Sequence, residues 1–151
     1  MIAVLVAAIA LLGATPVQLG APDPSFWCMD LVNVALADAG QTGGGTSPGA
    51  VMRSLMPLSV PSPGAIVAVD LFPGNGVAEH VAVVESVNGD GSLNTIEGNG
   101  PDRDRVVRST RPVAQVLGYG ATVEAGRAYR AGLCADLQLA KPWTDWDCGA
   151  Y

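Results

Sequence analysis

Apolar residues have the length and spacing of helices in the first third of the chain. An unbroken apolar run covers residues 2–12 and ends at Gly13. In residues 26–39 apolar side chains recur every three to four positions, and Gly40 follows. Both segments are predicted to be helices, because this spacing puts apolar side chains on one helix face and glycine often follows a helix end. A short third helix is predicted over residues 50–56.

A different pattern begins after Gly64 and is typical of strands. Short segments rich in valine and isoleucine alternate with turn sequences rich in glycine, asparagine and proline. The sequence NGDG at residues 88–91 indicates a hairpin turn. The predicted strands cover residues 65–70, 80–87, 92–99, 105–111 and 113–121. Helices followed by strands predict an α+β fold, with N-terminal helices packed on an antiparallel meander of about four to five strands.

The hairpin places three polar side chains at one end of the predicted sheet. With a four-residue turn, His80 lies opposite Asn99, and Ala82 lies opposite Glu97. Opposed residues and residues two apart point to the same face, so His80, Glu97 and Asn99 are predicted to share a face. Glu85 falls on the opposite face and is predicted to face solvent. A bulge, or a turn of different length, would move Glu97 and Asn99 together to the other face.

Cys28 is the residue on which the functional interpretation depends. It follows Trp27 at the start of the predicted second helix. The residues alone leave four possibilities: a packed core thiol, half of a disulfide, a metal ligand or a nucleophile. One histidine and scattered cysteines do not form a zinc site, and no metal or cofactor is predicted. A nucleophilic thiol needs a base, and His80 is the sole histidine. Helix N–H groups would favour its thiolate and stabilise an oxyanion.

Charge restricts the possible partners. The net charge is −6, and the 151 residues include one lysine. Nucleic-acid binding needs clustered basic residues, so nucleic acid is excluded as a partner. The one basic cluster alternates with aspartates and is interpreted as a solvated loop and strand, with anion binding as the alternative. Its members are Arg103, Arg105, Arg108 and Arg111.

The three cysteines predict one disulfide and one free thiol. Cys134 and Cys148 are close in sequence, and a bridge between them would close a loop of about 15 residues and stabilise by about 3 kcal/mol. Cys28 would then be the free thiol. Such a bridge implies an oxidising compartment outside the cytosol.

The N-terminal segment, residues 1–19, has two interpretations. It resembles the apolar core of a signal peptide, but no basic residue precedes that core and no clean small-residue cleavage site follows. The alternative is a buried first helix, which the missing basic residue favours. An apolar run of about 12 to 14 residues is too short to span a bilayer comfortably, so no stable membrane span is predicted.

Three segments of the chain resemble the CHAP family (cysteine, histidine-dependent amidohydrolase/peptidase) of the NlpC-type papain-like group. They are FWCMDLV around Cys28, PSPGAIVAVD before the sheet, and EHVAVVESVNGDGSLNTIEGN in the hairpin. Their order along the chain is the order of the family, and the resemblance covers roughly residues 20–121.

The resemblance implies a papain-like fold and hydrolysis of amide bonds in bacterial peptidoglycan, as an amidase or an endopeptidase. It implies Cys28 as nucleophile, His80 as base, and Glu97 with Asn99 as orienting or polar partners. Which of the last two contacts the imidazole is left open. The expected partner is a peptidoglycan stem peptide or cross-bridge, and the expected location is secreted, in the cell wall or released with phage.

The expected organisation has a catalytic domain at residues 20–122 and a C-terminal extension at residues 123–151. Ser25 and Trp27 are predicted to line a substrate groove, with core packing as the alternative for Trp27. The chain is expected to be a monomer. Two other functions are considered: a catalytically inactive structural or binding module of this fold, and an acyl transferase.

Overall fold

The computed structural model describes residues 1–128. In that part of the chain three α-helices precede one six-stranded sheet, and residues 123–128 are helical after it. The helices α1 (Ile2–Ala10), α2 (Cys28–Asp38) and α3 (Pro48–Arg53) come first. The strands follow as β1 (Met56–Leu58), β2 (Ile66–Val69), β3 (His80–Val87), β4 (Leu93–Glu97), β5 (Val107–Arg111) and β6 (Val116–Ala121), with a short 3-10 helix η1 (Val113–Gln115) before the last. The predicted α+β class is confirmed. Cys134 and Cys148, predicted to form a disulfide, lie outside the described residues.

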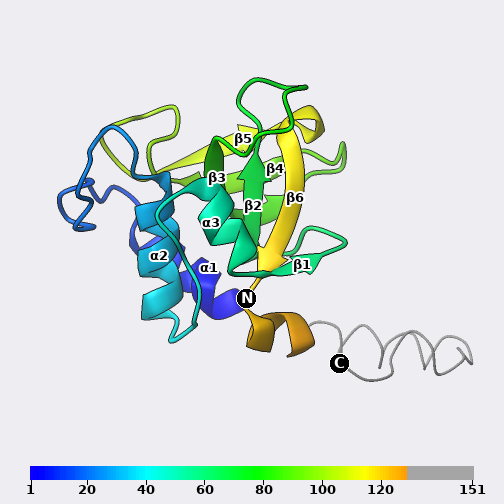
Figure 1. The fold of residues 1–151 in the computed structure, drawn as a ribbon, viewed down its shortest axis with the longest axis horizontal. Coiled ribbons are helices and arrows are strands. Elements are labelled where there is room, and N and C mark those ends of the chain that lie inside the picture. Colours follow the sequence, from blue (N-terminus) through cyan, green and yellow to red (C-terminus); the bar gives the residue numbers. More distant parts are fainter. Residues whose placement is uncertain (129–151) are drawn as a thin grey trace, which may run out of the picture.

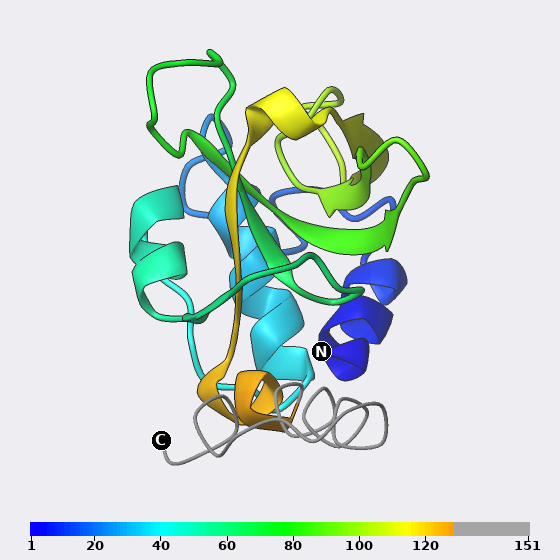
Figure 2. The ribbon, with the colours of Figure 1, turned by 90° about the vertical axis from the view of Figure 1, so that its right-hand side faces the viewer.

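The sheet is antiparallel and has the order β1-β6-β2-β3-β4-β5. The helices gather on one side of it, and α1 and α2 run next to each other (Figures 1 and 2). Valines and isoleucines on one face of β2, β3 and β4 pack against the helices, and the alternate residues of the same strands form a second apolar cluster. The strands are therefore buried on both faces, which explains their nearly continuous apolar sequences.

One strand was not predicted. Residues 50–56 were expected to be helical, but α3 ends at Arg53 and Met56 begins β1. This strand pairs only with β6, at the edge of the sheet. Pro57 fits this position, because an edge strand leaves one side of its backbone without a hydrogen-bonding neighbour. Tertiary pairing thus overrides the local helical pattern.

The N-terminal segment packs as a helix within the fold. Val4 and Ala8 of α1 are buried against the core, and Gly13 N–H donates to the Val106 carbonyl at 2.9 Å. Val106 N–H donates in turn to Ala14 at 2.8 Å. In residues 1–128, no helix has both the length and the apolar character needed to cross a membrane.

The hairpin of β3 and β4 combines two departures from the predicted register that cancel each other. At its tip Val87 pairs with Leu93, so the loop is one residue longer than predicted. A bulge at Glu85 then inserts one extra residue into β3. Beyond the bulge Val84 pairs with Thr95, which is the predicted register. The face of Glu97 is consequently the one that the sequence predicted.

Candidate active site

Cys28 is the first residue of α2, the helix that packs against β3. Its side chain is only 4% exposed. No side chain caps the helix, and among the described residues the N–H groups of Cys28 and Met29 have no hydrogen-bond acceptor. These unpaired donors give the start of α2 a positive partial charge, which favours a negative sulfur or oxygen there.

His80 and Glu97 meet at one end of the hairpin. His80 is the first residue of β3, and Glu97 is the last residue of β4. The Nε2 atom of His80 lies 3.1 Å from Oε2 of Glu97, and the two side chains are 2% and 0% exposed. The Cys28 side chain lies close enough to the imidazole to raise the pKa of His80. Since Nε2 faces Glu97, Nδ1 is the ring nitrogen left for the sulfur.

Two further groups hold the Glu97 carboxylate. Arg111 donates from Nε to Oε1 at 2.7 Å and from Nη2 to Oε2. The Thr95 hydroxyl donates to Oε1 at 2.6 Å. Burial works against the charge of Glu97, but the hydrogen bonds from His80 and Arg111 outweigh it and lower its pKa from 4.5 to about 2. Glu97 is therefore a carboxylate across the physiological range.

The same contacts favour the protonated form of His80. Burial disfavours an imidazolium, but the hydrogen bonds to Cys28 and Glu97 and the charge of Glu97 outweigh it. They raise the pKa of His80 from 6.5 to about 9. A cationic imidazole beside a thiol stabilises the thiolate, which is the reactive form of cysteine. The arrangement is thus suited to nucleophilic attack followed by proton donation.

Asn99 does not join this group. Its backbone is left-handed, with φ at 55°, so the strand alternation assumed in the sequence prediction ends at Glu97. The Asn99 amide donates to the Ser25 carbonyl at 2.9 Å instead. A side chain at Gly98 would collide with the Trp27 ring. Asn99 and Gly98 thus fasten the end of β4 to the segment before Cys28.

Trp27 was predicted to line a substrate groove, and this is wrong. Its side chain is 0% exposed, and Nε1 donates to the Arg103 carbonyl at 3.0 Å. Its size and burial make it a core residue that fixes the start of α2. The exposed aromatic residue of this segment is Phe26, at 68%. Ser25 is exposed, and it contributes its carbonyl to Asn99.

A family model of the CHAP domain matches residues 20–99, which is more than half of the chain. This chain belongs to the CHAP domain family. The resemblance stated from the sequence is therefore confirmed, and the match includes the positions of Cys28, His80, Glu97 and Asn99. No curated protein matches the chain.

Solved structures show the same fold. The CHAP chain resembles the crystal structure of Ly7917 with a TM-score of 0.53 and 20% identity, covering 80% of this chain and 61% of that one. A crystal structure of Ly7917 with the hydrolyzing product of MDP gives a TM-score of 0.51 and 20% identity, covering 80% and 62%. The CHAP chain thus spans about three fifths of the length of Ly7917. The papain-like fold implied by the resemblance is confirmed.

Sequence reasoning missed Arg111 as a member of the site. It was grouped with the arginines interpreted as solvated, and this holds for Arg105 and Arg108, whose side chains are 60% and 56% exposed. It is wrong for Arg111, which is 12% exposed and bonded to Glu97. The signal that would find it is the register of β4 and β5: Arg111 pairs with Leu93, which shares a face with Glu97.

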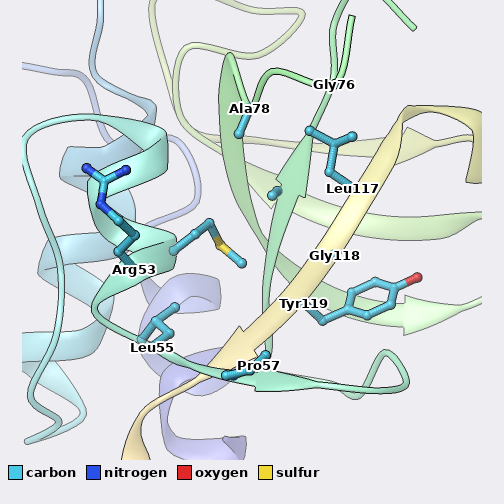
Figure 3. Close-up of a pocket in the computed structure, with 10 residues that line it drawn as sticks. Arg53, Leu55, Pro57, Gly76, Ala78, Leu117, Gly118 and Tyr119 are labelled. Carbon is cyan, nitrogen blue, oxygen red and sulfur yellow. The ribbon is translucent and has the colours of Figure 1, made fainter. Parts of the chain in front are cut away.

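A groove of about 480 Å³ lies between α3 and strands β2 and β6 of the CHAP domain. Figure 3 shows Arg53 and Leu55 on one side of it and Leu117 and Tyr119 on the other. Ala78, two residues before His80, lies at one end. Among the described residues its lining includes no thiol, imidazole or carboxylate. The groove therefore offers apolar contacts and one cation, and the reactive groups lie elsewhere.

No cluster of three or more histidine, cysteine, aspartate or glutamate side chains in residues 1–128 is arranged to hold a metal ion. Within that part of the chain Cys28 is a free, buried thiol. Its neighbours are the imidazole and the helix N–H groups, so its setting is that of a nucleophile rather than of a metal ligand.

Proposed function

We propose that the chain is a cysteine-dependent hydrolase of bacterial peptidoglycan that cleaves amide bonds as an amidase or an endopeptidase. Membership of the CHAP family supports the substrate class. The observation that carries the proposal is the contact of Cys28 with His80, whose far nitrogen faces the buried carboxylate of Glu97. A free thiol, a base and an orienting carboxylate in this order are the parts that nucleophilic acyl transfer needs.

In the first half of the reaction the Cys28 thiolate attacks the carbonyl carbon of the amide. A carbon–sulfur bond forms, and the negative charge moves to the carbonyl oxygen. The unpaired N–H groups at the start of α2 stabilise this oxyanion. His80 then gives its proton to the nitrogen of the leaving amine, the carbon–nitrogen bond breaks, and a thioester remains on Cys28.

In the second half water attacks the thioester. The neutral imidazole of His80 takes a proton from the water as the oxygen bonds to carbon. The carbon–sulfur bond breaks, the acid product leaves, and the thiolate beside an imidazolium is restored. Glu97 remains ionised throughout and holds the ring with Nδ1 toward the sulfur. Because peptidoglycan lies outside the cytoplasmic membrane, we propose that the protein acts there.

The test is digestion of purified peptidoglycan by the wild type, Cys28→Ala and Arg108→Met, with mass analysis of the released fragments. Arg108 is exposed and bonded to Glu85, so its replacement is the matched control for a folded variant. Fragments from the wild type and the control, and none from Cys28→Ala, support the proposal. Fragments from Cys28→Ala at the wild-type rate would remove Cys28 as nucleophile. No fragments from any of them would favour the inactive module.

A further inference from the structure

Glu97 is a fully buried carboxylate between two cationic side chains. His80 from β3 approaches one oxygen, and Arg111 from β5 donates to both. Thr95 adds a neutral donor from β4 itself. In the described chain, the ionisable groups that act on the Glu97–His80 pair are Arg111 and the Cys28 thiol from α2. A buried charge is strongly unfavourable unless it is paired, so each of these charges matters to the others.

Arg111 compensates the charge of Glu97 in each state of the proposed reaction. In the resting state one proton is shared by Cys28 and His80, and this pair is neutral whichever of the two holds the proton, so with Glu97 and Arg111 the charges add to zero. In the acyl-enzyme the sulfur is bonded and the imidazole is neutral, so Glu97 and Arg111 again add to zero. Without Arg111 the buried group would carry one uncompensated negative charge in both states. Glu97 would then take up a proton more readily, most of all when His80 is neutral.

We propose that Arg111 is a positioning residue of the active site, which keeps Glu97 ionised and fixed while His80 gives and takes its proton. The proposal depends on the proposed function for its reaction steps, but the pairing can be measured without substrate. Two parallel bonds from one guanidinium hold both oxygens of Glu97, which leaves the carboxylate a single orientation toward Nε2 of His80. Arg111 touches no reacting atom and acts through Glu97.

The strand that carries Arg111 also provides a matched control. Arg108 lies three residues earlier on β5 and bonds the carboxylate of Glu85, with Nε at 2.9 Å from Oε1. Its side chain is 56% exposed, whereas that of Arg111 is 12% exposed. Replacing either residue by methionine removes one guanidinium from the same strand. Only the replacement of Arg111 removes it from the active site.

The first measurement follows the imidazole resonances of His80 with pH. They are unambiguous, because the chain has one histidine. Protonation of Glu97 appears as a step at acid pH in these resonances. In Arg111→Met we expect this step to move upward by about one pH unit or more, because a cation beside a carboxylate lowers its pKa by about that much. Arg111→Lys keeps a charge and is expected to leave the step near its wild-type position. So is Arg108→Met.

The second measurement is kcat/KM for peptidoglycan fragments as a function of pH. Arg111→Met is expected to lower kcat/KM by about tenfold to a hundredfold, as the loss of supporting residues around a site does. Its acid limb should move to higher pH. Arg111→Lys should restore the limb and recover only part of the rate, since an ammonium cannot bind both oxygens in a fixed plane. Arg108→Met should match the wild type.

A double-mutant cycle separates this role from a contribution to folding. In Glu97→Gln the charge that Arg111 compensates is absent, so adding Arg111→Met should reduce kcat/KM by less than about twofold. The neutral pair also gives a folded reference if Arg111→Met alone unfolds. An equal loss in both backgrounds, or an acid step unmoved in Arg111→Met, would overturn the proposal. Absence of hydrolysis by the wild type would refute the proposed function and leave the resonance test standing.

Discussion

Two arginines of β5 each bind a carboxylate on another strand, Arg108 to Glu85 of β3 and Arg111 to Glu97 of β4, and the two pairs differ strongly in burial. Arg108 binds Glu85 with both distances near 3 Å, and the side chains are 56% and 21% exposed. Arg108 reaches both oxygens from Nε alone, whereas Arg111 binds Glu97 with two nitrogens, one for each oxygen, and the side chains of this second pair are 12% and 0% exposed. Both pairs join a guanidinium to a carboxylate, so the comparison shows mainly what burial does to such a pair. A pair exposed to water contributes little to the free energy of unfolding. In the interior, removal of one partner leaves the other charge buried and uncompensated, which is strongly destabilising.

The largest difference is expected in activity. Glu97→Gln keeps the shape of the side chain but removes the charge that orients and stabilises the imidazolium. We expect kcat/KM for peptidoglycan fragments to fall by about 10²- to 10⁴-fold, the range of effects seen when the orienting carboxylate of such a site is neutralised. Glu85→Gln is the matched control and should remain within about twofold. Equal activity of the two variants would show that burial of the pair has no catalytic consequence.

The next difference is expected in stability. Arg111→Ala leaves the carboxylate of Glu97 buried with one partner fewer, and we expect the free energy of unfolding to fall by about 3–5 kcal/mol. Arg108→Ala should lower it by about 1 kcal/mol or less, because its partner can turn to water. Urea unfolding at pH 7 measures both values. A loss below about 1 kcal/mol for Arg111→Ala would contradict the account.

The pH dependence of stability gives a third difference. The pKa of Glu97 is lower in the folded protein, at about 2, than its ordinary value of 4.5. Its stabilisation is therefore complete above about pH 4.5 and is lost as pH falls toward about 2, by about 3 kcal/mol in all. Glu97→Gln should lack this acid loss, and Glu85→Gln should retain it. Urea unfolding between pH 2 and pH 7 makes the comparison, and the same acid loss in Glu97→Gln would assign it to other groups.

The raised pKa of His80 gives the opposite dependence at alkaline pH. Its stabilisation is present below about pH 6.5 and is lost as pH rises through about 9. The acid loss removes the charge of Glu97 and the alkaline loss removes the charge of His80. Both losses include the stabilisation from the same ion pair, so the two free energies do not add. Stability should therefore be highest between about pH 4.5 and 6.5.

The smallest difference is expected in the response to salt. Charges in contact with water are screened over about 3 Å at 1 M salt, while buried pairs are screened much less. The effect of Arg108→Ala on unfolding should vanish at 1 M NaCl, and most of the effect of Arg111→Ala should remain. Urea unfolding of both variants at low and high salt tests this. A similar loss of both effects would place Glu97 in contact with solvent.

The sequence was sufficient to predict the end of the hairpin that carries the site. Alternation of apolar residues defined β3 and β4, and the NGDG turn joined them. The predicted placement of Glu97 on the same face as His80 then followed from the period of a strand. It depended on an assumed loop length that was wrong, and the bulge at Glu85 compensated for it. Local pattern fixes the face of a strand only when bulges are known.

Other features depended on contacts between distant segments and had no local signal. Met56 begins a strand because β6 pairs with it, and nothing in its neighbourhood indicates that partner. Asn99 leaves the strand conformation because Ser25 supplies an acceptor for its amide. Arg111 appeared among aspartates and arginines in the sequence, and only the register of β5 against β4 shows which of these arginines is buried.

The proposed reaction requires Cys28 to react as a thiolate beside His80. The most direct test is the rate at which iodoacetamide alkylates Cys28 at pH 6, followed at that residue by peptide mass analysis in the wild type, His80→Ala and Arg108→Met. We expect alkylation of Cys28 at least about tenfold faster than that of free cysteine, because a thiol of ordinary pKa is almost fully protonated at pH 6. His80→Ala should abolish this excess, and Arg108→Met should keep it. A wild-type rate no faster than free cysteine, or one unchanged in His80→Ala, would contradict the proposed reaction.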